Sequence, residues 1–171
     1  MKNILVPIGL SPNGKSTLAY AVELAKHFKS SIFVIDSYNT ASTPVQISSA
    51  KKVINSKNFK RVKEFVRSVQ TNYVDIKMVN YKGDLISGIE SLDNEIRIDL
   101  IVVGPKSNDL DEKLFLGKIS GKIVKKTTIP VLLVPIEFKF CIPKQGLFAF
   151  KKGNISGERS LSPLKYLIKK F

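Results

Sequence analysis

The chain has 171 residues, 43% of them hydrophobic, and carries a formal net charge of +14. This length supports one domain with a full core and is too short for two ordinary domains. No apolar run approaches the roughly 18 residues that span a bilayer, and the N-terminus lacks the long apolar stretch of a signal peptide. Cys141 is the single cysteine, which excludes an internal disulfide and fits a reducing compartment. We therefore expect a cytoplasmic protein without a membrane partner.

Strand-like and helix-like segments alternate along the first four fifths of the chain. The apolar runs that predict strands are, in order, 3–8 (NILVPI), 31–35 (SIFVI), 74–81 (VDIKMVNY), 100–103 (LIVV) and 131–134 (VLLV). The amphipathic segments that predict helices are 15–28, 49–73, the segment that follows Asp84, and 117–126. Asp84 is a good N-cap for the third helix, and either Ser11 or Asn13 is expected to cap the first. Residues 38–48 have the composition of a loop.

This alternation predicts an α/β fold, with a doubly wound five-stranded parallel sheet and helices on both faces. Ligands of such sheets bind at the carboxyl ends of the strands, where the strand order reverses. The first and fourth strands are the expected pair at that point. Their following loops are 9–14 and 105–116.

Residues 99–121 (DLIVVGPKSNDLDEKLFLGKISG) form the most informative stretch. A short buried strand ends at Gly104 and Pro105, a polar loop follows, and a helix begins near Gly117. The N-terminus of that helix places free backbone N–H groups and a positive dipole end near the strand's carboxyl end, which is a natural site for an anion such as phosphate.

The excess of positive charge is uneven. Residues 1–138 carry 20 basic and 13 acidic side chains, whereas residues 139–171 carry 8 basic and 1 acidic. The second predicted helix concentrates several of these cations, namely Lys51, Lys52, Lys57, Lys60, Arg61, Lys63 and Arg67. We interpret this run as a solvated helix face, and the alternative is a surface for nucleic acid or an acidic partner. Nucleic acid is not the partner that we expect.

The C-terminal segment resembles the beginning of the chain. Residues 143–171 can be aligned with residues 1–29, since both contain an apolar run, a turn with Asn and Gly, and an amphipathic helix that ends in Lys and Phe. We therefore predict one domain at 1–137, a linker at 138–143, and the start of a second repeat at 144–171, with one strand and one helix.

Four segments resemble the universal stress protein family. They are KNILVPIGLSPNGKSTLAYAVELAKHF, YKGDLISGI, DLIVVGPKS and LGKISGKIVKKTTIPVLLVP, which together cover most of residues 1–135. The resemblance implies an adenine nucleotide alpha hydrolase-like fold with strand order 3-2-1-4-5. It also implies a stress-response protein that acts through dimers or other partners, and the restarted repeat is similar to tandem members of the family.

Family members that bind ATP carry G-x-x-G, nine residues and G-Ser/Thr after the fourth strand, and an Asp after the first. This chain matches the glycines at Gly104 and Gly117, but has Ser107, Lys118 and Gly9 at the second glycine, the Ser/Thr and the Asp. By resemblance, Pro7 is retained, Val34 lies on the adenine side and the Ser120 hydroxyl can reach phosphate. The remaining candidates are the neighbours Ile8, Val103 and Ile119.

These departures favour a degenerate pocket that does not bind nucleotide, because Ser107 adds a Cβ beside the phosphate position and Gly9 removes an acceptor for nucleoside hydroxyls. The alternative is an ATP-binding stress sensor that uses Mg²⁺ and can include slow ATP hydrolysis. We predict neither a catalytic site nor a metal site, because His27 has no second ligand near it. The expected partner is a second copy paired through the fifth strand and the residues after it (131–140), or the second repeat itself.

Overall fold

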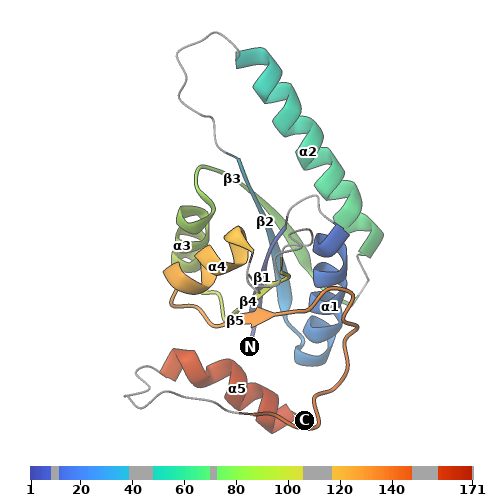
Figure 1. The fold of residues 1–171 in the computed structure, drawn as a ribbon, viewed down its shortest axis with the longest axis vertical. Coiled ribbons are helices and arrows are strands. Elements are labelled where there is room, and N and C mark those ends of the chain that lie inside the picture. Colours follow the sequence, from blue (N-terminus) through green and yellow to red (C-terminus); the bar gives the residue numbers. More distant parts are fainter. Residues whose placement is uncertain (9–11, 39–47, 70–72, 106–116, 148–157, 171) are drawn as a thin grey trace.

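A computed structural model describes residues 1–8, 12–38, 48–69, 73–105, 117–147 and 158–170, and in residues 48–58 only the helix backbone is described. It contains the expected doubly wound sheet (Figure 1). The strands are β1 (Asn3–Pro7), β2 (Ser31–Tyr38), β3 (Ile76–Lys82), β4 (Leu100–Val103) and β5 (Val131–Leu133). The helices are α1 (Pro12–Phe28), α2 (Ser48–Val69), α3 (Leu85–Ile96), α4 (Lys118–Lys126) and α5 (Glu158–Lys170).

All neighbouring strands of the sheet are parallel, in the order β3-β2-β1-β4-β5, which confirms the predicted fold class and strand order. The chain runs outward from β1 to β3, returns to the centre and then fills the other side with β4 and β5. The order therefore reverses between β1 and β4, where Ile4 and Leu5 pair with Leu100 and Ile101. This arrangement places the carboxyl ends of β1 and β4 next to one another.

Helices cover both faces of the sheet, as Figure 1 shows, with α1 and α2 on one face and α3 and α4 on the other. The first face is packed by apolar side chains such as Val6, Leu18 and Val62. The second is packed by a separate group that includes Leu5, Ile89 and Ile123. Side chains from alternate positions of β1 enter different cores, as the period of two in a strand requires, and this is why its apolar run has no polar interruption.

The structure changes several predicted boundaries. β2 continues three residues beyond the predicted end, through Asp36, Ser37 and Tyr38, which pair with 80–82 of β3. These polar residues extend the ladder beyond the apolar core, so hydrophobicity alone did not mark them. β3 begins at Ile76 instead of residue 74, and α2 ends at Val69 instead of residue 73.

The prediction that Asn13 caps α1 is wrong, because Asn13 lies inside the helix, which begins at Pro12. A proline at the first helical position is favourable, since its missing N–H would be unbonded there in any case. The other predicted cap, Ser11, lies outside the described residues. The predicted cap of α3 is confirmed, because Asp84 accepts a hydrogen bond from the Ile86 N–H at 3.1 Å.

The sheet edge at β5 is much shorter than residues 131–140. The strand ends at Leu133, and the chain then turns through Glu137, whose φ is 59°, while the Phe138 N–H bonds the Pro135 carbonyl at 3.2 Å. We call residues 135–142 the strap. Its rings pack on α1, with ring centroids 5.4 Å apart for Phe140 and Tyr20 and 5.1 Å apart for Phe140 and His27. The strap therefore anchors the chain on the α1 side after it leaves the sheet (Figure 1).

The predicted helix of the second repeat is present as α5. The strand expected before it is not found in the described residues 144–147, which are exposed and adopt neither helix nor strand, and residues 148–150 lie outside the described part. The division into a first domain, a linker and a second repeat stays a prediction. No helix within the described residues is long and apolar enough to cross a membrane.

Candidate functional site

The candidate site lies at the carboxyl ends of β1 and β4. Ile8 extends β1 by one further bond, because its N–H donates to the Ile35 carbonyl of β2 at 3.0 Å. Gly104 and Pro105 leave β4 beside it, and α4 begins after Gly117. The fold therefore brings Ile8 and the Gly104–Pro105 pair, from which two of the predicted loops start, to one edge of the sheet, at the point where the strand order reverses.

Gly104 is a point of close approach between β4 and α1. A Cβ built on Gly104 would lie 2.4 Å from Oγ1 of Thr17, which is far inside van der Waals contact. Thr17 is 3% exposed, so its side chain has little room to move away. A glycine is therefore required here by the packing of the helix against the strand, whether or not a phosphate binds nearby.

Two side chains hold the backbone that leaves β4. The Asn13 Nδ2 atom of α1 donates to the Pro105 carbonyl oxygen at 3.0 Å. The Ser120 hydroxyl of α4 donates to the Gly104 carbonyl oxygen at 2.7 Å. Asn13 and Ser120 are both buried, so each bond also satisfies a polar group that water does not reach. Consecutive carbonyls are thus fixed by helices on opposite faces of the sheet.

The N-terminus of α4 has no capping side chain. The N-cap residue is Gly117, which has no side chain to bond the free N–H groups, and the first turn contains no acidic residue. The first backbone bond of the helix runs from the Gly121 N–H to the Gly117 carbonyl at 2.8 Å. The backbone N–H groups of the first turn are therefore not used by the helix itself, as the anion-site prediction requires.

An ion pair joins the N-cap of α3 to the middle of α4. The Lys122 Nζ atom lies 2.5 Å from Oδ1 of Asp84, whose other oxygen caps α3. The hydrogen bond from Lys122 is the largest cause that lowers the pKa of the Asp84 carboxyl below its usual value. This pair fixes the two helices relative to each other on the same face of the sheet.

Asp36 is an acidic residue at the same edge of the sheet that the sequence reasoning missed. It is half-buried near the carboxyl end of β2, one position after Ile35, which pairs with Pro7 of β1. Burial raises the pKa of its carboxyl, and a backbone hydrogen bond from Ser37 opposes that effect. Within the described residues we find no ion pair for this carboxylate. The apolar run at 31–35 gave no signal for it, because the polar end of the strand has the composition of a loop.

The structure brings together Pro7, Ile8, Gly104, Gly117 and Ser120 at this edge. Val34 and Val103 belong to the strands and are 0% and 3% exposed, so they support the site from within the core and offer no surface to a ligand. The Ile119 side chain is 62% exposed and therefore does not form a buried wall of a ligand pocket. Gly9, Ser107 and the Lys118 side chain lie outside the described residues.

Two supporting residues, Asn13 and Thr17, were not predicted as part of this site. They lie four positions apart on α1, and so occupy one face of the helix, which is the signal that could have identified them. Among the described residues, no three His, Cys, Asp or Glu side chains gather as a metal site would require.

Comparison with known proteins agrees with this geometry. A sequence model described as the universal stress protein family matches residues 1–135. No protein with a curated function matches the chain. Among solved structures, the chain is similar to a universal stress protein UspA from Lactobacillus plantarum, with 18% identity and a TM-score of 0.67, over 78% of this chain and 97% of that one.

Two further similar structures contain nucleotides. One is described as a universal stress protein in complex with cAMP, with 17% identity and a TM-score of 0.58, over 78% of this chain and 96% of that chain. The other is a universal stress protein from Archaeoglobus fulgidus in complex with dAMP, with 14% identity and a TM-score of 0.56, over 78% and 97% of the two chains. At these identities, the likeness establishes the fold.

Proposed function

The chain belongs to the universal stress protein family, and we propose that it is a regulatory stress-response protein that acts through protein partners and does not depend on ATP. The observation that supports this proposal is that the matched motif residues serve the fold itself. Gly104 accommodates Thr17, and the Ser120 hydroxyl donates to the Gly104 carbonyl. Both residues are therefore explained without a nucleotide.

The residues that differ from the motif of the ATP-binding members also support a protein that does not depend on ATP. Ser107 replaces a glycine, Gly9 replaces a carboxylate, and Lys118 replaces a hydroxyl residue. Their loss removes the acceptor for the nucleoside hydroxyls and adds a side chain where phosphate would approach the backbone. We include no catalytic step in this proposal. We place the protein in the cytoplasm, on the support of its one unpaired and exposed cysteine.

The partner surface in this proposal is the β5 edge, used by a second copy of the chain or by a second repeat. Leu133, Ile136 and Phe138 are between 41% and 46% exposed at the end of β5 and in the strap. Three large apolar side chains in one short segment favour contact with another protein surface. Analytical ultracentrifugation over a range of concentrations tests the pairing, with Leu133→Lys and Phe138→Lys as disrupting variants.

An ATP-binding sensor is the second candidate. The observation that favours it is the uncapped N-terminus of α4, whose N–H groups face the same edge as Gly104. Two similar structures hold cAMP and dAMP, which shows that the fold can bind adenine nucleotides in other proteins. In this candidate, Lys118 would hold phosphate as a point charge.

A thermal-shift experiment separates the two candidates. A ligand at a concentration 100 times its Kd stabilises the folded state by about 2.7 kcal/mol, which raises Tm by several degrees for a protein of this size. We expect 5 mM ATP with Mg²⁺ to leave the Tm of the natural chain unchanged. A variant that combines Gly9→Asp, Ser107→Gly and Lys118→Ser restores the binders' residues, and we expect ATP to raise its Tm. A rise in the natural chain would instead establish the sensor.

A further inference from the structure

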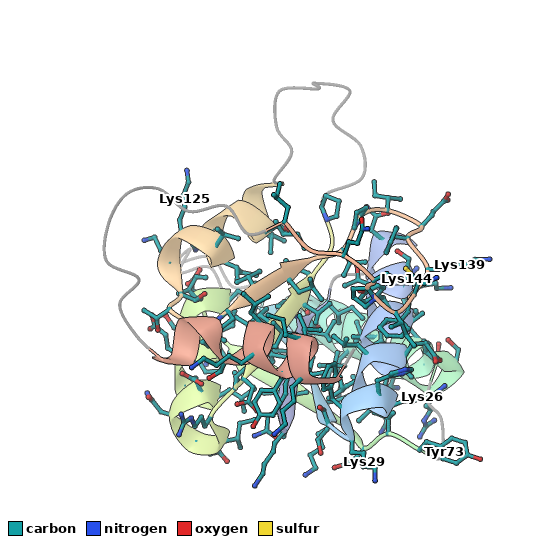
Figure 2. The ribbon with its side chains drawn as sticks, turned by 90° about the horizontal axis from the view of Figure 1, so that it is seen from below. Lys26, Lys29, Tyr73, Lys125, Lys139 and Lys144 are labelled. Carbon is teal, nitrogen blue, oxygen red and sulfur yellow. The ribbon has the colours of Figure 1, made fainter. Side chains whose placement is uncertain are left out.

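The two faces of the domain differ in charge. The described side chains of α1 and α2 include six basic and two acidic residues. Those of α3 and α4 include three of each. Figure 2 shows Lys26 and Lys29 toward one side of the molecule and Lys125 toward the opposite side. Among the described side chains of these four helices, the net positive charge is therefore concentrated on α1 and α2.

Three cations form a row along α2. Lys60, Lys63 and Arg67 are exposed and stand three and four positions apart, so they share one face of the helix. Apolar side chains of the same helix, Val62 and Val66, are buried in the core on a different face of the helix. Among the described side chains, no ion pair joins any cation of this row to a carboxylate. The charges of the row are therefore available to an external anion.

The length of the row suits a chain of phosphates. At 1.5 Å per residue, the seven steps from Lys60 to Arg67 span about 10 Å along the helix axis. Three consecutive phosphates of one nucleic-acid strand are two steps apart, about 7 Å at the 3.4 Å rise of a strand in a duplex, and the long Lys and Arg side chains of the row can converge on that length. A regular polyanion can therefore meet all three cations in succession.

An exposed aromatic side chain lies beyond the end of α2 toward which the row runs. Tyr73 precedes β3 and is 87% exposed, which is unusual for a large ring with apolar faces. Figure 2 shows it on the same side as Lys26 and Lys29. Single-stranded nucleic acids bind surfaces where cations follow the backbone and an aromatic ring stacks on a base. Tyr73 thus supplies the second element of such a surface.

From these observations we infer that α2 forms a binding surface for single-stranded nucleic acid, in which Lys60, Lys63 and Arg67 contact consecutive phosphates and Tyr73 stacks on an unpaired base. The surface reads no base sequence, because the cations contact the phosphate backbone and stacking on Tyr73 accepts any base. Glu64 lies beside the row on α2 and lowers its net charge by one. It lies on a helix face that is separate from the β1 and β4 edge, so this inference does not rest on the nucleotide pocket.

Fluorescence anisotropy with a labelled single-stranded RNA of 20 nucleotides and mixed sequence tests the inference on the full chain at 25 to 200 mM KCl. We expect binding at low salt that weakens as salt rises. The variant Lys60→Gln/Lys63→Gln/Arg67→Gln should lose at least tenfold in affinity at 50 mM KCl. Its slope of log affinity against log salt should also fall by about 2, which corresponds to three phosphates of a single strand.

A matched control exists on the other face. The variant Arg97→Gln/Lys125→Gln/Lys126→Gln also removes two lysines and one arginine. Arg97 follows α3, Lys125 and Lys126 lie in α4, and all three are exposed. We expect this variant to retain affinity within about twofold. Tyr73→Ala should weaken RNA binding about tenfold. Tyr73→Phe should bind RNA as the natural chain does, since stacking needs the ring and not the hydroxyl. Circular dichroism confirms that each variant is folded.

Three results would overturn the inference. The first is an absence of RNA binding by the natural chain at 25 mM KCl. The second is an equal loss of affinity in the row variant and the control variant, which would mean that only the total charge matters. The third is displacement of RNA by poly-glutamate as effective as by unlabelled RNA, together with no effect of Tyr73→Ala, which would assign the face to an acidic protein.

Discussion

The Ser120 hydroxyl and the Gly104 carbonyl oxygen lie 2.7 Å apart and join α4 to the end of β4. In the binders' motif, the equivalent hydroxyl is expected to reach phosphate. Here its proton is committed to a backbone carbonyl, and the bond is shielded from water because Ser120 is 4% exposed. A residue that resembles part of a ligand site therefore has a structural role that does not require the ligand.

Replacing this hydroxyl tests that structural role. We expect Ser120→Ala to lower the free energy of unfolding by about 1 kcal/mol, because the Gly104 carbonyl loses its donor in a buried position. Urea denaturation monitored by circular dichroism measures the change. Ser87→Ala, at an exposed position of α3, is the control and should change stability by less than about 0.5 kcal/mol. An equal effect of both variants would contradict the role of this bond.

The contact between Gly104 and Thr17 predicts a coupled pair of substitutions. Gly104→Ala should destabilise the chain by about 1–3 kcal/mol, because the new Cβ overlaps with the Thr17 hydroxyl. Thr17→Ala removes that oxygen, so the double variant should be more stable than the sum of the single effects predicts. A double-mutant cycle from urea midpoints measures this coupling. Strict additivity would show that the overlap is not the cause.

The Asp84–Lys122 pair predicts a loss of stability in acid. The hydrogen bond from Lys122 lowers the pKa of Asp84 in the folded state, so its contribution is complete above the unfolded pKa of about 3.9. That contribution is lost as the pH falls from there through the lower folded pKa. We expect Asp84→Asn to have a lower urea midpoint than the natural chain at pH 7, and the difference to shrink below pH 4. A constant difference down to pH 2.5 would argue against the pair.

Asp36 predicts the opposite change of stability with pH. Burial raises the pKa of its carboxyl in the folded state, so folding becomes less favourable as the pH rises from the unfolded pKa through the folded one. Asp36→Asn removes this ionisation, and we expect it to raise the urea midpoint at pH 7 and to have little effect at pH 3. Measurements at the two pH values decide the matter, and a destabilised variant at pH 7 would show that the carboxylate makes a favourable contact.

The sequence predicted those features whose cause is local or periodic. The four apolar residues Leu100–Val103 formed a buried strand, and the Asp84 cap was confirmed, because both depend on neighbouring residues. The extension of β2 through Asp36 was missed because pairing with β3, and not hydrophobicity, determines where that strand ends. Asn13 has the residue type of a helix cap, and no local pattern shows that its partner is the Pro105 carbonyl, which is distant in sequence.

The same distinction applies to the candidate site. The position of Gly104 and Gly117 beside β1 followed from the order of the elements along the chain. The contact that explains Gly104 did not, because it requires the packing of α1 on β4, which brings Thr17 to the glycine. Tertiary contacts of this kind connect residues more than 80 positions apart, and no local pattern records them.

The strap limits how the β5 edge can bind. Since β5 has only three residues before the chain turns toward α1, its outer edge offers few free backbone N–H and C=O groups to an added strand. A short edge of this kind resists indiscriminate strand addition, which depends on a long ladder. In the proposed pairing, recognition at this edge would therefore depend on the shapes of individual side chains, and we expect a substitution at Ile136 or Phe138 to change the pairing while the sheet remains intact.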